Sequence, residues 1–460
     1  MTWKNLIARK NIVMLGCGAV GEQMLQILRL EIPDIIPRTT IVEAMPCKKK
    51  IADAYGAKFL CYRCSENDME HVLSHLINRD TVVVNVTVQV LTSAIIRICQ
   101  KMGALYIDTS NESWPSISNG GESITADRLQ NMDALASEVN GGSTALICHG
   151  ANPGLVSHFV KEALRVYAAS KGHSVPSGAK PWAKLARDMG LVSIHLSELD
   201  TQIARRSSLD GKFANTWSVS GFLEEANEPA HFAWGTREPP ASCDAAIRTG
   251  PKKLRMVQFQ ERARSAVIRS WIPSQGTYDA LAIPHPEVFT IAELLSCHEE
   301  DVYQPTVLFA YRPSIHCLSS LNNPAAATHH VLKSELTDGW DELGALLIFQ
   351  DGNAFWYGSR LRVAQSRAST PQGNATIQQV CAGILGGIAW MLHFPRAGLM
   401  RAEDIDHDLV LEIARPYLGS LRGISCRWVD NTGSRPWPTA PLLRFGSLGE
   451  NSHWSATAFA

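Results

Sequence analysis

Acidic residues and tryptophans occur together in the middle of the chain, a combination suited to holding an organic cation. Glu198 lies in the segment SELDT, Trp217 lies in NTWS, and Glu225 follows soon after. A carboxylate pairs with positive charge, and the face of an indole attracts a cation by about 0.5–2 kcal/mol. These side chains predict a pocket for an amine that carries more than one positive charge. Other candidates in the same region are Trp234, His285, Glu287 and Asp351.

A glycine-rich motif near the N-terminus is suited to binding the phosphates of a dinucleotide. Gly16, Gly18 and Gly21 complete the pattern G-x-G-x-x-G directly after the apolar run 12–15. The first glycine permits a tight turn, the second lets a pyrophosphate approach the backbone, and the third lets a helix pack against the strand. Glu43 ends a second apolar segment about 20 residues on, where a carboxylate can accept hydrogen bonds from ribose hydroxyls. The predicted cofactor contacts here are Gly16, Gly18, Ala19, Val20, Gly21 and Glu43.

The charges near the second apolar segment bear on the choice of dinucleotide. Glu43 would repel the 2′-phosphate of NADP, whereas the basic run Lys48–Lys50 could meet that phosphate. An acid at this position is typical of proteins that bind NAD. We therefore expect NAD and keep NADP as the alternative.

The elements around these residues predict an N-terminal Rossmann-type domain. Six apolar segments alternate with helical patterns over residues 1–152, and residues 81–86 lack the polar alternation of a half-exposed strand. This order is typical of a doubly wound parallel sheet with helices on both faces. Ligands of such sheets lie beyond the carboxyl ends of the strands. The loops expected there add Thr87, Asp108, Thr109, Glu112 and Asn152 as candidates.

Residues 153–372 predict a second domain, of the α+β class with a mixed sheet, for binding substrate. Residues 192–198 and 256–259 alternate between apolar and polar types, which indicates a sheet with one wetter face. Asp351-Gly352-Asn353 lies between two apolar runs and predicts a hairpin turn. We expect residues 373–425 to form a helical segment that packs back on the first domain, and residues 426–460 to form an irregular arm.

The longest apolar segment, 376–392, contains Gly383, Gly386 and Gly387. Glycine in a helix is unfavourable by about 1 kcal/mol relative to alanine, and it is tolerable where another backbone must come close. The run is also shorter than the roughly 20 residues that span a bilayer. We therefore expect a buried helix and no membrane association.

Composition and charge restrict the class of protein further. A chain of 460 residues is too long for one simple hydrophobic core, so more than one domain is expected. A formal net charge of −1 gives no indication of a basic surface for nucleic acid. No signal-peptide pattern precedes the first strand, and the 11 cysteines are scattered. These features predict reduced thiols in the cytoplasm. Cys61 and Cys64 form a C-x-x-C without a second pair at zinc spacing, so no metal site is predicted.

The segments that carry the candidates resemble those of the bacterial homospermidine synthase family, within the wider saccharopine dehydrogenase-like group. The likeness runs over about residues 10–420, and its most particular parts are ANPGLVSHF, SELDTQ and NTWS. The matching segments are 16–21, 108–109 with Glu112, 152–158, 197–202, 215–218, 234–236, 285–287 and 383–388.

This resemblance implies a homodimeric NAD-dependent enzyme that joins two putrescines to homospermidine and releases ammonia. NAD would act as a retained hydride shuttle through imine intermediates, and spermidine could replace one putrescine as the aminobutyl donor. The resemblance implies that Trp217 holds the cationic intermediate and that Glu198 and Glu225 bind ammonium groups. The remaining residues implied to line the pocket are Glu112, Asn152, His285, Glu287 and Asp351.

Two other functions stay open on the sequence alone. A saccharopine- or carboxyspermidine-type reductase would join an amine to a carboxylated carbonyl compound, and Arg237 or Arg312 would be needed to hold the carboxylate. A non-catalytic dinucleotide-sensing protein would bind NAD without turning over any diamine. The concentration of acids beside aromatic residues argues against the sensor.

Overall fold

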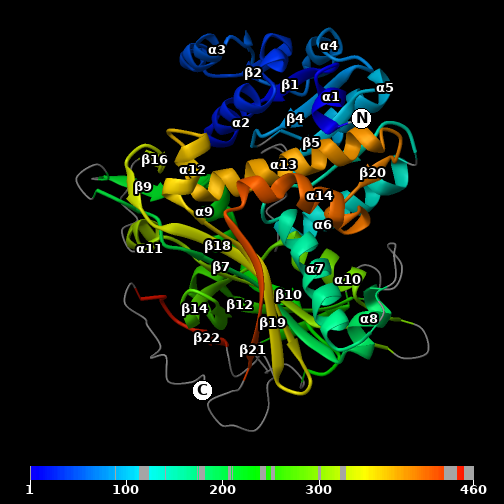
Figure 1. Cartoon of the computed structure of the whole chain (residues 1–460), viewed down its shortest axis with the longest axis vertical. Helices are drawn as coiled ribbons and strands as arrows, with labels where there is room; N and C mark the ends of the chain where they lie inside the picture. Colours follow the sequence, from blue (N-terminus) through cyan, green and yellow to red (C-terminus); the bar gives the residue numbers. More distant parts are fainter. Residues whose placement is uncertain are drawn as a thin grey trace. The chain divides into compact units, whose positions relative to one another are not determined.

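The computed structural model divides into two compact units, and the chain passes between them three times. The first unit comprises Met1–Leu155 and Ala364–Tyr417, and the second comprises Val156–Val363 and Leu418–Ala460. Figure 1 follows the chain by colour from blue to red. The structure describes residues 2–88, 90–112, 124–139, 141–173, 175, 182–205, 209, 211–238, 245–249, 254–298, 302–321, 328–428 and 443–449.

A seven-stranded parallel sheet forms the centre of the first unit. Its strand order is β20-β6-β5-β4-β1-β2-β3, so the first six strands have the order of a doubly wound dinucleotide fold. The predicted Rossmann-type sheet is confirmed. The seventh strand was not predicted, because Leu399 and Met400 lie between Gly398 and Arg401 and belong to no longer apolar run. The strands are β1 (Asn11–Leu15), β2 (Thr39–Glu43), β3 (Lys58–Cys61), β4 (Thr81–Asn85), β5 (Leu105–Asp108), β6 (Ala145–Leu146) and β20 (Leu399–Met400).

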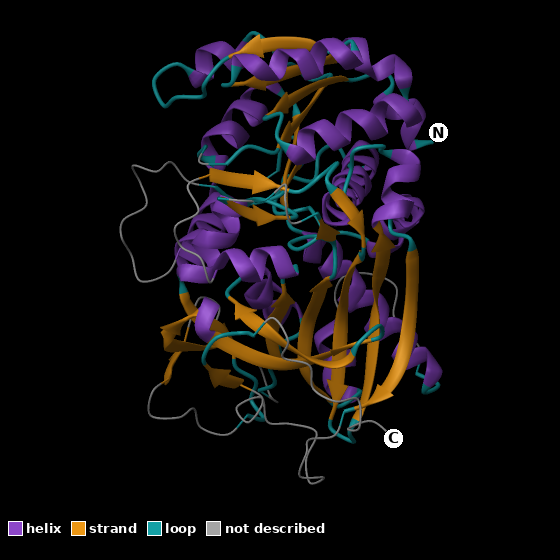
Figure 2. Ribbon diagram, turned by 90° about the vertical axis from the view of Figure 1, so that its left-hand side faces the viewer, coloured by secondary structure: helices purple, strands orange, loops and turns teal. Residues whose placement is uncertain are grey.

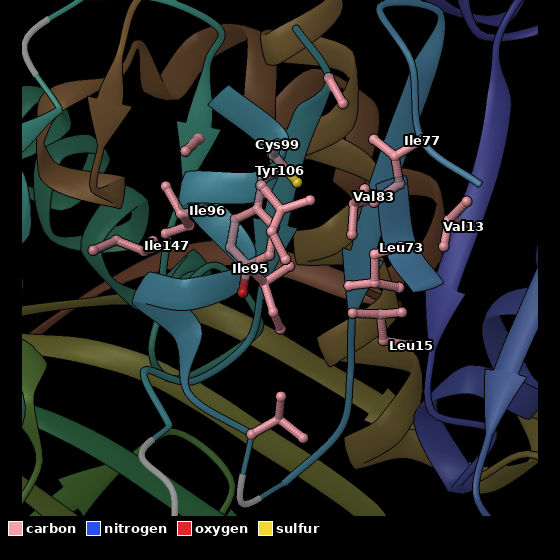
Figure 3. Packing of buried hydrophobic residues seen from close by; sticks show 14 of the residues in the cluster. Val13, Leu15, Leu73, Ile77, Val83, Ile95, Ile96, Cys99, Tyr106 and Ile147 are labelled. Carbon is pink, nitrogen blue, oxygen red and sulfur yellow. The ribbon is translucent and has the colours of Figure 1, made fainter. Parts of the chain in front are cut away.

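Helices cover both faces of this sheet. On one face, side chains such as Val13 and Val83 pack against Leu73, Ile95 and Met132 from the helices that follow β3, β4 and β5. Figure 3 shows much of this core in close-up. On the other face lie α2 and the C-terminal helices. The helices are α1 (Trp3–Ile7), α2 (Ala19–Glu31), α3 (Lys49–Tyr55), α4 (Met69–Ser74), α5 (Thr92–Met102), α6 (Ile124–Glu138), α12 (Val363–Ser369), α13 (Ala375–His393) and α14 (His407–Ala414), with short 3-10 turns η1 (Pro33–Arg38), η2 (Pro46–Lys48), η6 (Ala402–Asp404) and η7 (Arg415–Tyr417).

The long apolar helix α13 is buried in the first unit, and its glycines lie at close contacts. A Cβ on Gly383 would come within 1.9 Å of the carbonyl oxygen of Gly150, and one on Gly387 within 2.6 Å of Ile107 Cδ1. The predicted close approach of another backbone is confirmed. The prediction was wrong in excluding a membrane span by length, since the helix has 19 residues and suitable hydropathy; 94% of its most apolar window is instead buried inside the protein.

The second unit contains a mixed sheet of 11 strands, as predicted for an α+β domain. Eight strands follow in the order β11-β12-β10-β15-β7-β18-β19-β21, and β14, β13 and β22 continue from β15. Figure 2 shows the long strands of this sheet side by side. The strands are β7 (Leu191–Asp200), β10 (Pro229–Ala233), β11 (Ala245–Thr249), β12 (Arg255–Arg262), β13 (Ala266–Ile272), β14 (Gly276–Ile283), β15 (Thr306–Arg312), β18 (Trp340–Phe349), β19 (Asn353–Arg362), β21 (Ser420–Arg427) and β22 (Leu443–Phe445).

Helices and two small strand pairs complete the second unit. The pairs are β9 (Lys212–Asn215) with β16 (Thr328–Val331) and β8 (Ile203–Ala204) with β17 (Leu336–Asp338). The helices are α7 (Leu155–Ser170), α8 (Trp182–Asp188), α9 (Val219–Asn227), α10 (Pro286–Leu294) and α11 (Ile315–Leu321), with the 3-10 turn η5 (Ala263–Ser265). The predicted hairpin turn at Asp351–Asn353 joins β18 to β19, and Gly352 has a φ of 84° there.

Strand β7 differs from the prediction of a wetter face, because all ten of its residues are buried. Several of its polar side chains are hydrogen-bonded inside the protein. The hydroxyl of Ser197 accepts a bond from Trp356 Nε1 at 2.9 Å, and His195 Nδ1 lies 3.2 Å from the hydroxyl of Ser270. The alternation of polar residues in β7 therefore marks buried polar groups on a strand that is covered on both faces.

The C-terminal region also differs from the prediction. The helical segment ends at Tyr417 rather than 425, because β21 leaves it and pairs with β19 in the second unit. The arm is not wholly irregular, since β22 pairs with β13; residues 429–442 and 450–460 lie outside the described ranges. The other boundaries fall at 155 and 363 rather than 152 and 372. The loop at 150–154 stays with the first sheet because the N–H of Leu155 bonds back to Gly150.

Candidate active site

The glycine-rich loop joins β1 to α2, and its three glycines have three different surroundings. Gly16 has a φ of 95°, a conformation that other residues rarely adopt. At Gly18, the N-cap residue of α2, a Cβ would meet no described atom within 4 Å, so the start of the helix faces open space. A Cβ on Gly21 would lie 2.6 Å from the carbonyl oxygen of Gly16. This geometry fits a tight turn, a phosphate cradle and a close helix contact.

Glu43 ties the end of β2 to the glycine loop. Its two carboxylate oxygens accept the N–H groups of Cys17 and Met45, each at 2.9 Å. Each oxygen keeps a lone pair for a further donor, such as a ribose hydroxyl. The fixed negative charge is suited to hydroxyl groups and opposes a phosphate, so the residues present fit NAD better than NADP.

Asp108 lies buried at the end of β5 within a chain of hydrogen bonds. Its carboxylate accepts from the hydroxyl of Tyr106 at 2.8 Å and from the N–H of Cys148 at 2.6 Å. Asn85 donates to the Tyr106 hydroxyl, and Thr87 donates to Asn85. Burial raises the pKa of Asp108 to about 7. The structure therefore places Asp108 in the scaffold that holds the loop of Thr87, rather than in an exposed binding surface.

Glu112 lies buried beyond the end of β5. Its carboxylate accepts a bond from the hydroxyl of Ser110 at 2.8 Å, and the Arg128 guanidinium lies 3.7 Å away. The N–H of Glu112 donates to Thr92 Oγ1 at 2.9 Å. Part of its negative charge is thus balanced inside the first unit, which makes Glu112 a weaker ammonium binder than its residue type indicates.

Asn152 lies in the loop that follows β6, and Thr109, which directly follows β5, lies beside that loop. The peptide bond between Asn152 and Pro153 is cis. Both polar atoms of the Asn152 side chain are buried, and neither has a hydrogen-bond partner among the described residues. Thr109 packs against the same loop, since a Cβ on Gly150 would be 3.4 Å from its Cβ. A buried amide without a partner is costly, so Asn152 fits a residue that binds a ligand.

Sheet register in the second unit gathers acidic side chains on one face. Glu198 on β7 pairs with Tyr311 on β15, and Asp200 pairs with Asp341 on β18. Residues two apart in a strand share a face, so all four side chains lie on one side of the sheet. Burial, and then the negative charges of Asp341, Asp200 and Glu225, raise the pKa of Glu198 well above its ordinary value. We call Glu198, Asp200, Glu225 and Asp341 the acid cluster.

Asp200 connects the acid cluster to the loop that carries Trp217. The hydroxyl of Thr216 donates to its carboxylate at 2.5 Å, and Gln202 donates both its N–H and its side-chain amide at 2.9 and 3.1 Å. Burial raises the pKa of Asp200 to about 6, although these donors oppose the shift. Thr216 directly precedes Trp217, so the tryptophan is anchored next to the acids.

Trp217 is held from two sides. Its Nε1–H donates to the hydroxyl of Tyr311 at 2.9 Å, and the ring of Phe222 meets it edge-on with centroids 6.1 Å apart. The following residue, Ser218, caps α9 by accepting the N–H of Gly221. A Cβ on Gly221 would lie only 3.1 Å from the indole, so the glycine makes room for it. The indole is half-buried.

The structure thus brings together the three residues on which the prediction of a cation pocket depended. Glu198 and Glu225 are close enough for the charge of one to shift the pKa of the other, and Trp217 is hydrogen-bonded to the strand partner of Glu198. Sequence reasoning missed Asp200, Asp341 and Tyr311. Asp200 could have been found as the i+2 neighbour of Glu198, whereas the other two depend on strand register.

His285 and Glu287 lie at the start of α10. The His285 ring meets Phe309 at 5.6 Å, and Phe309 stacks on Tyr311 at the same centroid distance. A row of rings therefore runs from His285 to the side chain that holds Trp217. The hydroxyl of Ser157 on α7 donates to the carboxylate of Glu287.

Two predicted site residues do not join this group. Trp234 is 1% exposed and packs beside Phe232, so it belongs to the core. Asp351 lies in the exposed turn next to Phe349, the strand partner of Leu191. Leu191 and Glu198 are seven residues apart, about 23 Å of strand at roughly 3.3 Å per residue. The prediction that Asp351 lines the pocket was wrong, because its segment forms a hairpin at the far end of the sheet.

Arg312 and Arg237, the two arginines that a reductase would need to hold a carboxylate, are not suited to the face of the sheet that carries Glu198. Arg312 pairs with Leu199 and so points to the side of the sheet opposite Glu198. Its guanidinium donates to the carbonyl oxygens of Asp279 and Gly449 at 3.0 and 3.3 Å. Arg237 is exposed. The described residues that shift the pKa of Glu198 are all acidic, which favours a cationic ligand over a carboxylate.

Comparison with known proteins identifies the family of the chain. The saccharopine dehydrogenase NADP binding domain matches residues 12–146, and the saccharopine dehydrogenase C-terminal domain matches residues 150–425. The homospermidine synthase of Mesorhizobium japonicum is 34% identical over 94% of this chain and 96% of its own. That of Blastochloris viridis is 33% identical over 92% of each chain.

Solved structures give the same result. The crystal structure of a homospermidine synthase from Legionella pneumophila in complex with NAD has a TM-score of 0.87 and 31% identity, over 95% of this chain and 98% of that one. A saccharopine dehydrogenase from Saccharomyces cerevisiae, at 13% identity over 90% of this chain and 99% of that one, shares the fold with a TM-score of 0.53. With relatives this similar along nearly its whole length, the chain belongs to the homospermidine synthase family, as the resemblance of its segments predicted.

Proposed function

We propose that this protein is a homospermidine synthase. It transfers an aminobutyl group from putrescine to a second putrescine and yields homospermidine and ammonia; with spermidine as the donor, the amine released is 1,3-diaminopropane instead of ammonia. The observation that carries the proposal is the acid cluster beside the Trp217 indole. Glu198 is 7% exposed, and the charged groups that raise its pKa are the acids Asp341, Asp200 and Glu225, an arrangement suited to a cationic ligand. A diamine carries a positive charge at each of its two ends.

The residues that would hold NAD belong to the first unit. The backbone of the loop 16–21 would bind the pyrophosphate, and Glu43 would accept the ribose hydroxyls. Bound NAD supplies a hydride acceptor for the carbon next to an amine and later a hydride donor for the new imine. Thr87 and Thr109 would contact the cofactor from neighbouring loops, and Asp108 would hold the Thr87 loop in place through Asn85.

The residues of the second unit would bind and orient the amine. Glu198 and Glu225 would pair with ammonium groups, and the Trp217 face would stabilise an iminium cation. Carbon–hydrogen cleavage next to nitrogen requires a neutral amine, and a carboxylate whose pKa is raised can accept the proton. Burial of the acid cluster also keeps water away, which protects the imine from hydrolysis. Further substrate contacts would come from Glu112, Asn152, His285 and Glu287.

We also propose that the enzyme is a cytoplasmic homodimer that acts on small diamines and binds neither nucleic acid nor membrane. The net charge of −1 and the burial of α13 bear on the last part, since neither a basic surface nor an exposed apolar helix is offered by these features. Size-exclusion chromatography with light scattering tests the dimer. A mass of one chain at micromolar protein would overturn it.

Product analysis tests the proposed reaction. The protein is incubated with putrescine and a trace of NAD, and polyamines and ammonia are quantified by mass spectrometry and an ammonia assay. We expect homospermidine and ammonia in equal amounts, with no net NADH. NADH that accumulates, or a need for an added keto acid, would favour the reductase instead, and NAD binding without any product would favour the sensor.

A further inference from the structure

One hydrogen bond in the second unit joins a half-buried tryptophan to a fully buried tyrosine. The Nε1–H of Trp217 donates to the hydroxyl of Tyr311 at 2.9 Å. Tyr311 is 1% exposed, whereas Trp217 lies in the loop between β9 and α9. A loop side chain is thus attached to the centre of a sheet through a single polar contact.

The tyrosine is a rigid acceptor. It lies on β15 between two strand partners, Glu198 on β7 and Leu281 on β14. Its ring stacks on Phe309 at 5.6 Å with an interplanar angle of 19°, and it meets Phe222 edge-on at 6.1 Å. A side chain packed on its face and its edge has little freedom to turn, so the position of its hydroxyl is well defined.

The surrounding charges keep this acceptor neutral. Burial, and then the negative charges of Glu198 and Asp200, raise the pKa of Tyr311 well above its ordinary value. The hydroxyl therefore stays protonated at any working pH and adds no further charge to the acid cluster. Donation by the indole N–H also makes the indole face more negative, which favours a cation above that face.

We propose that Tyr311 is a positioning residue that holds the Trp217 indole at one angle beside the acid cluster. The inference rests on the proposed function, because the cation that needs the indole face is the imine intermediate. Tyr311 touches neither substrate nor cofactor in this role. When the hydrogen bond is lost, the indole tilts within the space that Gly221 leaves, and the imine is less well shielded from water.

Tyr311→Phe tests the proposal because it removes one oxygen and keeps the ring contacts. A hydrogen bond contributes about 0.5–1.5 kcal/mol, so we expect kcat for homospermidine to fall roughly 3- to 10-fold. KM for putrescine should change less than about twofold, since the carboxylates remain, and free aminobutanal should increase. The matched control is Tyr303→Phe, which removes a buried hydroxyl bonded to the carbonyl oxygen of Leu191 at 2.8 Å, at the far end of β7. It should behave as wild type.

A double-mutant cycle separates positioning from general loss of structure. Trp217→Phe keeps an aromatic ring but has no N–H to donate, so Tyr311→Phe should have no further effect on kcat in that background. An equal loss in both backgrounds, or wild-type kcat and aminobutanal release in Tyr311→Phe, would overturn the proposal.

The same cycle can be followed without turnover, by near-ultraviolet circular dichroism of the four proteins. Tyr311→Phe should weaken the indole bands only where Trp217 is present; equal spectra in wild type and Tyr311→Phe would refute the inference. Absence of homospermidine from the wild type would count against the proposed function alone, because this spectral comparison still decides the role of Tyr311.

Discussion

Removing one charge from the acid cluster should weaken substrate binding and leave the fold intact. Glu198→Gln keeps the size and hydrogen-bonding shape of the side chain and removes its negative charge. Glu198 is nearly fully buried on a ten-residue strand, and its acidic neighbours Asp200, Glu225 and Asp341 are left in place. The substitution therefore tests the pairing of Glu198 with an ammonium group.

The size of the effect follows from the pairing. A hydrogen bond to a charged group contributes about 1.5–3 kcal/mol, which corresponds to roughly 10- to 150-fold in affinity. The remaining acids still attract the cation, so we expect KM for putrescine to rise within this range rather than binding to be abolished. The free energy of unfolding without ligand should not fall, because the change relieves repulsion among buried carboxylates.

The assay measures homospermidine formation over a series of putrescine concentrations at saturating NAD. Asp351→Asn is the matched control, since it also removes one carboxylate charge from the same unit but at the far end of β7. It should leave KM unchanged. A Glu198→Gln enzyme whose KM stays within twofold of wild type would show that the acid cluster is not the ammonium site, and a large effect of Asp351→Asn would show that our placement of the pocket is wrong.

Three further outcomes are expected from single substitutions. Trp217→Ala should release aminobutanal in place of most homospermidine, whereas Trp217→Phe should keep part of the activity; unchanged products from the alanine variant would remove the indole from the mechanism. Glu43→Gln should shift the ratio of kcat/KM between NAD and NADP toward NADP by about tenfold, the effect of about 1.4 kcal/mol of lost repulsion; an unchanged ratio would contradict the role of its charge. In the wild type, Asp108 has a pKa of about 7 in the folded state, above its unfolded value, so its contribution to stability is present at low pH and is lost as pH rises toward 7. Asp108→Asn should therefore flatten the dependence of the unfolding free energy on pH between 4 and 7, by roughly 4 kcal/mol for about 3 pKa units, and urea titrations across that range would reveal a slope that persists if the assignment is wrong.

The first unit was predictable because its signals are local. The three glycines, the apolar run before them and Glu43 lie within one stretch of chain, and each role follows from backbone geometry that a short pattern determines. The glycines of α13 also predicted a close backbone contact, though not that the contact would be Gly150. The role of Asp108 could not be predicted from local sequence signals of this kind. A polar residue at a strand end indicates a site, but only tertiary structure shows that its oxygens bond to Tyr106 and Cys148.

The second unit was harder to predict because its site depends on which strands are neighbours. Asp341 lies beside Asp200 only through the pairing of β18 with β7, and Tyr311 lies beside Glu198 only through the pairing of β15 with β7. Sequence distance gives no register between such strands. The assignment of Asp351 to the pocket failed for a related reason. Its acidity and the nearby tryptophan suggested that it lies close to Glu198, whereas the hairpin places it at the far end of the sheet.

The alternation of polar and apolar residues in β7 predicted a strand with one face in water, and this prediction was wrong. Alternation usually marks a strand with one face in water, yet every residue of β7 is buried. On one face, Ser197 is bonded to Trp356; on the other, Glu198 and Asp200 are acids whose pKa values are raised. Burying like charges in this way destabilises a protein unless a ligand balances them. A buried strand that retains two carboxylates on one face is therefore best explained by a cationic ligand, and the stability of the apoprotein should increase when putrescine is added.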